Sequence, residues 1–228
     1  MKIAVIPARG GSKRIPRKNI KNFCGKPMIA WAIKTALKSG IFDHVIVSSD
    51  DTEIIETSQE YGASVPFIRP SRLADDFTPT VPVIAHAIDE CNLLGWDIVS
   101  ACCIYPSVPF LEPEDLVSAY SLMQRKNANF VYPVTEFVHP TQRAMRQLNS
   151  GQMEFVNSSN ELTRTQDLET TYHDAGQFYW GQAGAWLAHK KMHTDGIGMV
   201  IPNWRVVDID NSDDWTRAEN LSKVLNKG

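Results

Sequence analysis

Apolar, β-branched runs alternate with segments of helical periodicity along most of the chain. The runs "KIAVIPA" and "HVIVSSD" are typical of buried strands, and "MIAWAIKTALKSG" between them has the spacing of a helix that ends at Gly40. Further helices are predicted at 51–62, 80–95 and 112–127, and further strands at 97–106 and 130–137. Strands that alternate with helices at this spacing predict an α/β fold, with a mostly parallel twisted sheet and helices on both faces.

The alternation breaks between about Val138 and Tyr172, where polar, hairpin-like pieces surround an Asn-Ser-Gly turn. We interpret 138–172 as an insertion within one domain that spans 1–228. After it, the pattern predicts a strand and a short helix at 176–192 and strand segments at 198–210. A final helix is predicted over 212–228, capped by Ser212 and with acids in its first turn.

Composition excludes several classes of protein. With 43% hydrophobic and 21% charged residues and a formal net charge of -3, the chain is an ordinary globular protein without the basic stripe of a nucleic-acid binder. The four cysteines form no C-x-x-C pair, so neither a zinc site nor a disulfide framework is predicted. No segment has the pattern of a signal peptide or a membrane span, and we expect a cytoplasmic protein with no membrane partner.

Positive charge is concentrated in "IPARGGSKRIPRKNI", from Ile6 to Ile20, directly after the first predicted strand. The stretch matches neither the Walker A pattern nor G-x-G-x-x-G, which argues against a P-loop hydrolase and a dinucleotide oxidoreductase. Ligands of open α/β sheets bind at the carboxyl ends of strands, and cations spread around a glycine-containing loop suit a nucleoside triphosphate. A charged loop exposed to solvent is the alternative.

Two carboxylates in "VDID", Asp208 and Asp210, offer a complementary site near the other end of the chain. Side chains alternate along an extended segment, so both carboxylates can face one Mg²⁺ ion. Such an ion would offset charge that develops on a phosphorus and its leaving group. A polar strand end with capping acids is the alternative.

The opening stretch resembles the signature I-P-A-R-x-G-S-K followed by K-N of the CMP-sialic acid synthetase family, and "RPSRLADD" and "VDIDNSDDW" extend the likeness. The resemblance implies a Rossmann-like, nucleotide-diphospho-sugar transferase fold, a Mg²⁺-dependent cytidylyltransferase and a homodimer joined by the insertion. It implies that Arg9, Gly10, Gly11, Ser12, Lys13, Lys18, Asn19, Arg69 and Thr80 bind CTP. It further implies that Arg9, Lys18, Asp208 and Asp210 are catalytic and that the two aspartates hold the metal.

The acceptor end departs from the sialate pattern. The chain has "YPSVPF" where these synthetases have Q-P-T-S-P-L, and "DAGQFYWG" where they have N-G-x-x-Y. Both stretches resemble the subgroup that activates pseudaminic acid, a nine-carbon sugar acid whose methyl-bearing groups suit aromatic surfaces. The residues expected to bind the sugar are Tyr105, Ser107, Gln177, Tyr179 and Arg164. A two-fold contact through the insertion would place Arg143, Arg146 or Arg164 near the acceptor bound to the opposite subunit, and an insertion folded back on its own domain is the alternative.

The expected reaction is CTP plus pseudaminic acid to CMP-pseudaminic acid and diphosphate, which would serve the glycosylation of surface glycans or flagellin. A synthetase for CMP-sialic or CMP-legionaminic acid is the alternative within enzymes. A non-catalytic nucleotide-binding protein could keep the basic loop, but it would not need both Lys18 and the aspartate pair. Core packing is the alternative for Phe178, Tyr179 and Trp180, and alternation predicts it for about half of them.

Overall fold

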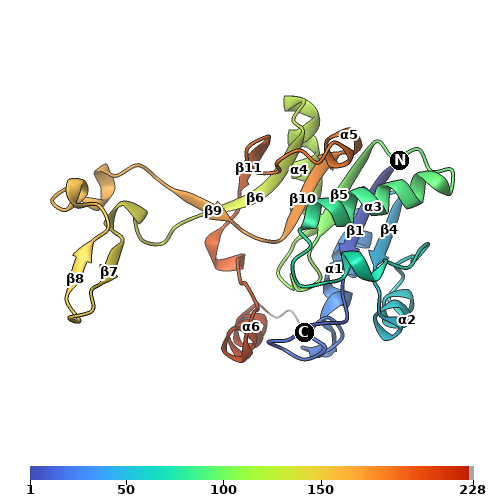
Figure 1. The fold of residues 1–228 in the computed structure, drawn as a ribbon, viewed down its shortest axis with the longest axis horizontal. Helices are drawn as coiled ribbons and strands as arrows, with labels where there is room; N and C mark the ends of the chain where they lie inside the picture. The colour runs from blue at the N-terminus through green and yellow to red at the C-terminus, as the bar shows by residue number, and fades with distance from the viewer. Residues whose placement is uncertain (226–228) are drawn as a thin grey trace.

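The computed structural model describes residues 1–225 and contains one central sheet flanked by helices (Figure 1). The strands of this sheet are β1 (Lys2–Pro7), β4 (His44–Ser48), β5 (Ser100–Ile104), β6 (Phe130–Glu136), β9 (Tyr172–Asp174), β10 (Phe178–Gln182) and β11 (Gly196–Val200). They follow in the order β11-β6-β10-β5-β1-β4, with β9 paired to β6 off this path. The half formed by β5, β1 and β4 is parallel, whereas β10 and β9 add antiparallel pairs.

Helices cover both faces of the sheet, so the predicted α/β fold is confirmed. They are α1 (Met28–Ser39), α2 (Thr52–Glu60), α3 (Thr80–Leu93), α4 (Pro113–Lys126) and α5 (Ala183–Leu187), whereas α6 (Ser212–Val224) lies beyond the strand ends and covers neither face (Figure 1). Alternate residues of β1 face opposite ways: Ala4 and Ile6 pack with α1 and α4, and Ile3 and Val5 pack with α3 and α5. None of the helices within residues 1–225 combines the length and apolar character needed to cross a bilayer.

The predicted end signal of α1 is confirmed, and that of α6 is wrong. Gly40 ends α1 in the left-handed conformation, with φ of 64°, and the Asp51 side chain caps α2 by accepting from Ile54 N at 3.0 Å. The predicted cap of α6 is wrong, because Asn211 and not Ser212 occupies that position. The Asn211 amide oxygen accepts from the first turn while Asp214 accepts from the backbone N–H of Asn211, a reciprocal capping box. The last part of the predicted helix, 226–228, lies outside the described residues.

A third apolar cluster lies beyond the carboxyl ends of β1 and β5. The short strands β2 (Asn22–Phe23) and β3 (Lys26–Pro27) form a separate pair, and Phe23 packs edge-on against Trp215 of α6, with ring centroids 5.3 Å apart. Ile209 is buried in the same cluster. The strand predicted over 198–210 is wrong beyond Val200: Pro202 has no N–H to extend the ladder, and a 3₁₀ turn follows at Asn203–Arg205. The aspartate segment, residues 206–210, therefore has no strand partner and is held by other contacts.

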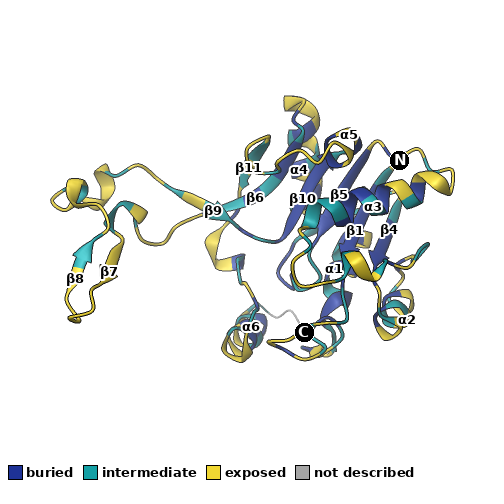
Figure 2. Cartoon of the chain, viewed as in Figure 1, coloured by how far each residue is buried: buried dark blue, intermediate teal, exposed yellow. Residues whose placement is uncertain are grey.

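An arm of residues 137–171 projects from the body, at the left of Figure 1. It carries a separate hairpin, β7 (Met145–Gln147) and β8 (Met153–Phe155), whose turn includes Gly151 with φ of 86°. Most of its surface is exposed to solvent (Figure 2). The exposed side chains include large apolar ones, namely Phe137, Val138, Met145, Leu148, Met153, Val156 and Leu162.

Candidate active site

Two adjoining cavities open at the carboxyl ends of β1 and β5. The first, about 310 Å³, lies between the basic loop and the aspartate segment, and the second, about 460 Å³, lies towards the amino end of α3. Both are lined by Pro7, Arg9, Arg14 and Tyr105. A ligand that filled both cavities would therefore cross a boundary formed by two guanidinium groups and a phenol.

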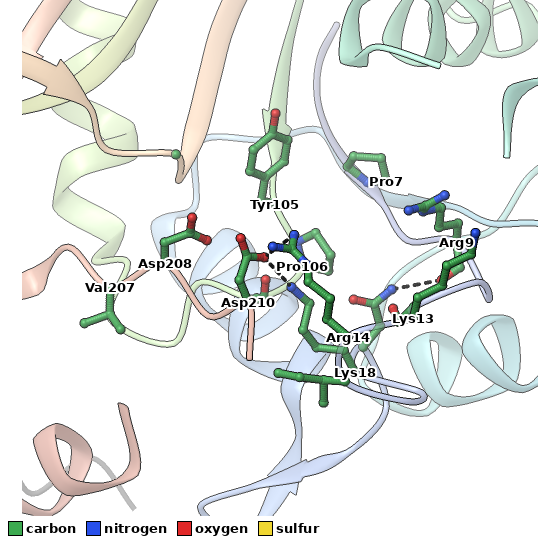
Figure 3. Close-up of a pocket in the computed structure, with 15 residues that line it drawn as sticks. Pro7, Arg9, Lys13, Arg14, Lys18, Tyr105, Pro106, Val207, Asp208 and Asp210 are labelled. Carbon is green, nitrogen blue, oxygen red and sulfur yellow. Dashed lines mark hydrogen bonds and ion pairs between the residues drawn. The ribbon is translucent and has the colours of Figure 1, made fainter. Parts of the chain in front are cut away.

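Most of the predicted site residues line one of these cavities. The first is lined by Arg9, Ser12, Lys13, Lys18, Asn19, Tyr105, Ser107, Asp208 and Asp210, and the second adds Arg69 and Thr80. In Figure 3, Asp208 and Asp210 lie on one side and Arg9 and Lys13 on the other, with Arg14 and Lys18 between them. Residues separated by about 190 positions in the sequence thus meet, as Lys18 and Ile209 do in a hydrogen bond with a sequence separation of 191.

The two glycines of the basic loop do not line either cavity. A Cβ on Gly10 would come within 2.5 Å of an Asp51 carboxylate oxygen, and its N–H donates to Asp50 Oδ1 at 3.2 Å. Gly10 is therefore required for the close approach of the loop to the start of α2. A Cβ on Gly11 would meet open space.

Arg17 also holds the basic loop against the start of α2, and it lines neither cavity. Its guanidinium pairs with Asp51, with Nη2 and Oδ1 3.0 Å apart, and with Glu53. The hydrogen bond from Arg17 lowers the pKa of the Asp51 carboxyl below its usual value. One of the five cations in the predicted phosphate loop is thus a structural anchor.

Arg9 and Lys13 are paired with the same acid, Asp76. Arg9 Nη1 lies 2.5 Å from Asp76 Oδ1 and donates to the Asp75 carbonyl at 2.7 Å, and Lys13 Nζ contacts Asp76 Oδ2. The two cations lower the pKa of the Asp76 carboxyl, mainly through the Lys13 hydrogen bond. The Asp76 carboxylate thus pairs with two of the cations that are predicted to bind phosphate.

Replacing Asp76 with asparagine is expected to lower the KM for CTP by about two- to fivefold, because a triphosphate then no longer competes with this carboxylate for Arg9 and Lys13. The change should shrink as salt screens the charges. Initial rates at low and high ionic strength measure it, with Asp43→Asn, remote from both cavities, as the control. A raised KM would instead show that Asp76 holds the cations in their binding positions.

Lys18 is the most enclosed cation of the basic loop. Its ammonium donates to the carbonyl of Ile209 at 2.7 Å and lies 3.7 Å from Asp210 Oδ1. Burial lowers the pKa of Lys18, an effect that the charges of Asp210 and Asp208 partly offset. The buried amide of Asn19 donates to the Arg9 carbonyl at 3.1 Å, so Asn19 shapes the loop from inside.

The aspartates form a carboxylate pair with unequal surroundings. Arg14 Nη2 lies 2.8 Å from Asp210 Oδ1. Asp208 has no such partner among its described contacts. Burial raises the pKa of its carboxyl, and the negative charge of Asp210 raises it further. Two carboxylates on the same cavity are oxygen donors of the kind that Mg²⁺ prefers, and such an ion would relieve their repulsion.

Arg69 and Thr80 lie on the second cavity. The buried Arg69 side chain donates from Nε to Ser48 Oγ at 3.1 Å, and burial lowers its pKa to about 10. Thr80 Oγ1 and the Tyr105 hydroxyl are 2.9 Å apart, so the first residue of α3 fixes the phenol at the boundary between the cavities. Arg69 is therefore anchored to the end of β4, next to the cavity.

Three of the predicted sugar-binding residues do not line the first cavity. Gln177 and Tyr179 are buried, and Arg164 lies in the arm, where its Nε is 2.8 Å from Asp167 Oδ2. Phe178 and Trp180 are also fully buried, so core packing holds for all three aromatic residues and not for half of them. Gly176, next to Gln177, does line the cavity.

Sequence reasoning does not single out three polar groups, namely Arg14, which lines both cavities, and Asp174 and His193, which line neither. The Asp174 carboxylate accepts from the N–H of Gly176, a residue of the first cavity, at 2.8 Å. Arg14, which pairs with Asp210, was only one cation of a run. Asp174 accepts from the Tyr179 hydroxyl at 2.6 Å and lies 2.8 Å from His193 Nε2. The replacement of the family's N-G-x-x-Y pattern was the one signal that pointed to Asp174, and nothing in the sequence indicated its contact with His193.

Comparisons with known proteins identify the family. A family model described as "Cytidylyltransferase" matches residues 3–194. The chain belongs to the cytidylyltransferase family. The pseudaminic acid cytidylyltransferase of Campylobacter jejuni is 42% identical over 225 residues, covering 97% of this chain and 96% of that protein. The CMP-N,N'-diacetyllegionaminic acid synthase of Legionella pneumophila is 28% identical, with 97% and 96% covered.

A solved structure supports the fold of this cytidylyltransferase. The CMP:2-keto-3-deoxy-manno-octonic acid synthetase complexed with CTP matches with a TM-score of 0.70 at 15% identity, covering 98% of this chain and 99% of that chain. At this identity the likeness establishes the fold alone. The cytidylyltransferase therefore shares the fold of that synthetase.

Proposed function

We propose that this cytidylyltransferase converts CTP and pseudaminic acid to CMP-pseudaminic acid and diphosphate. The anomeric hydroxyl of the sugar acid attacks the α-phosphorus of CTP, the new O–P bond forms as the bond to diphosphate breaks, and the hydroxyl proton leaves to solvent or a base. The observation that carries the proposal is the pair of cavities that meet at Arg9, Arg14 and Tyr105, in a chain 42% identical to a pseudaminic acid cytidylyltransferase.

The nucleoside is assigned to the second cavity and the acceptor to the first. Arg69 and Thr80 would then contact the cytidine, and Arg9, Ser12, Lys13 and Lys18 would take the phosphates from the loop after β1. Backbone and cationic groups around a triphosphate neutralise its charge and orient the α-phosphorus. Tyr105 would separate the base from the sugar acid, with Ser107 and Gly176 on the acceptor side.

Asp208 and Asp210 would hold Mg²⁺ together with oxygens of CTP. Bound there, the ion supplies charge stabilisation for the α-phosphate and the departing diphosphate. Lys18 would hold its ammonium at the same phosphate, since it is fixed by the Ile209 carbonyl beside Asp210. Arg14 would balance Asp210, which leaves the unpaired Asp208 as the more accessible ligand.

Activation of legionaminic acid is the second candidate, because a CMP-N,N'-diacetyllegionaminic acid synthase also matches this chain almost from end to end. The test of the proposed reaction is an incubation of the protein with CTP, pseudaminic acid and Mg²⁺. We expect release of diphosphate and a product with the mass of CMP-pseudaminic acid. Release of diphosphate without a sugar acid, or no product, would contradict the proposal.

The arm is assigned to dimerisation. Its exposed apolar side chains need a surface to bury against, and an isologous contact with a second copy would supply one. Leu162 is 94% exposed and Val138 is 73% exposed, which is untypical of an arm that works alone in water. Residues 138–172 would thus form the contact between subunits of a homodimer.

Replacing Leu162 with aspartate is expected to convert a micromolar dimer to monomers, because a charge in the centre of an apolar contact has no partner. Sedimentation velocity measures the change. Leu93→Asp is the control, since Leu93 is 81% exposed at the end of α3 and outside the arm. A wild-type protein that sediments as a monomer and is fully active would contradict the assignment.

Arg164 would reach the acceptor of the opposite subunit, because the arm carries it away from its own cavities (Figure 1). Heterodimers of an Asp210→Asn subunit and an Arg164→Ala subunit contain one intact site if sites are shared. They are expected to recover about half of the wild-type activity per dimer. Confirmed heterodimers with no recovery would contradict a role for Arg164 across the interface.

A further inference from the structure

Residues 206–210 carry both candidate metal ligands, yet they form no strand or helix. Downstream, the segment is fixed by the buried Ile209 side chain and by the Asp214 carboxylate, which accepts from Asp210 N at 3.0 Å. Lys18 fixes the Ile209 carbonyl. All of these contacts hold the segment at or after Ile209, so a different contact must hold the part before Asp208.

Arg205 provides the upstream contact. It ends the 3₁₀ turn, and its side chain is only 8% exposed. The guanidinium makes a two-pronged ion pair with Asp115 in the first turn of α4, with Nη1 2.5 Å from Oδ2 and Nη2 3.2 Å from Oδ1. Such a fork fixes both the distance and the angle between two elements, which a single point charge does not.

The backbone of Arg205 is tied to a different element. Its carbonyl accepts from Gln177 Nε2 at 3.1 Å, and the Gln177 carbonyl accepts from Tyr105 N at 2.9 Å. Gln177 is 4% exposed, and its amide nitrogen holds the backbone of Arg205. One continuous chain of contacts therefore runs from α4 through Arg205 and Gln177 to Tyr105 at the boundary of the cavities.

We propose that Arg205 is a positioning residue, which with Asp115 and Gln177 sets the distance of Asp208 and Asp210 from the ends of β5 and β10. Gln177, expected from the sequence to bind sugar, acts here through the backbone of Arg205. Groups that orient metal ligands from behind are commonly worth ten- to hundredfold in metal affinity. This inference rests on the metal site of the proposed function.

The test measures metal binding without turnover, using Mn²⁺ and CTP with no sugar acid present. Enhancement of water-proton relaxation reports Mn²⁺ bound to the protein–CTP complex. For Arg205→Met we expect affinity for Mn²⁺ to fall by about tenfold or more, while calorimetric affinity for CTP in excess chelator changes by less than about twofold. The basic loop, which does not touch Arg205, accounts for the unchanged binding of CTP alone.

Further variants separate positioning from stability. Arg205→Lys should recover part of the Mn²⁺ affinity, since an ammonium makes one prong of the fork, and Asp115→Asn and Gln177→Met should each lower it by about threefold or more. Asp115→Asn also serves if Arg205→Met does not fold. Ile88→Val, a truncation on the buried face of α3, is the control: it should lower Tm by about 2–4 °C and leave Mn²⁺ affinity unchanged.

The outcomes are distinct. If Arg205→Met and Asp115→Asn lower Tm as Ile88→Val does but keep wild-type affinity for Mn²⁺, the role of Arg205 is structural and the inference is wrong. If the affinity for CTP measured in excess chelator falls as much as the affinity for Mn²⁺, the positioning role is likewise excluded. A wild-type protein that binds no Mn²⁺ with CTP would overturn the metal assignment itself, and this inference with it.

Discussion

Replacing Asp208 with asparagine is expected to lower kcat by about a hundredfold or more, the scale of removing a main electrostatic stabiliser of a transition state. The carboxylate lines the first cavity, and burial together with the charge of Asp210 raises the pKa of Asp208. A group whose folded pKa is raised destabilises the fold when it is ionised, above the folded pKa. The variant should therefore keep or slightly raise Tm at neutral pH while it loses turnover.

Asp210→Asn should lower kcat by a similar factor for an additional reason. Asp210 is the partner of Arg14 at 2.8 Å and lies 3.7 Å from Lys18, so the neutral amide leaves two cations without their acid. Asp213→Asn, an exposed acid at the start of α6, is the matched control and should retain full activity. The turnover of the three variants, Asp208→Asn, Asp210→Asn and Asp213→Asn, is measured as diphosphate release over a series of Mg²⁺ concentrations. Full wild-type turnover in excess chelator would contradict the metal site.

The second large effect is expected for Lys18→Ala, which should lower kcat by about a hundredfold with a small change in the KM for CTP. The ammonium is held by the Ile209 carbonyl, so it is fixed before the substrate arrives and can stabilise charge that appears only in the transition state. Arg9→Ala and Lys13→Ala should raise the KM for CTP, because these side chains meet charges that already exist in the bound substrate.

Two controls make the lysine prediction specific. Lys21→Ala removes a cation that lies 4.5 Å above the Trp215 ring and lines neither cavity, so kcat should not change. Lys18→Arg should not restore turnover, since the larger guanidinium does not fit the half-buried site between Ile209 and Asp210. Near-wild-type kcat for Lys18→Ala would remove the residue from the chemistry.

The alternation of apolar runs and helical patterns was enough to predict the fold, because each strand of the parallel half is buried on both faces. The sequence "SACCI" of β5, buried at every position, is the clearest instance. The same reasoning failed where a local pattern is compatible with two different structures. "VVDID" alternates as a strand does, but Pro202 ends the ladder before it, and Asn211 competes successfully with Ser212 for the cap of α6.

The candidate site was predictable to the extent that topology brings it together. Because the loop after β1 and the residue after β5 leave the same edge of the sheet, Arg9 and Tyr105 had to be neighbours. Contacts between distant side chains were not predictable from periodicity: the pairing of Asp76 with Arg9 and Lys13, and that of Arg205 with Asp115, depend on loops whose path the pattern does not determine. Alternation also could not tell which face Tyr179 would occupy.

The measurement that tests the account most directly is diphosphate release from CTP with pseudaminic, legionaminic and sialic acids compared side by side in one assay. Each acid is supplied to the wild-type protein with Mg²⁺ at saturating CTP, and kcat/KM is determined for each. We expect pseudaminic acid to be preferred over both others by about a hundredfold or more, because buried polar groups of the site match one substrate and not the others. Equal or greater kcat/KM with legionaminic or sialic acid would contradict it.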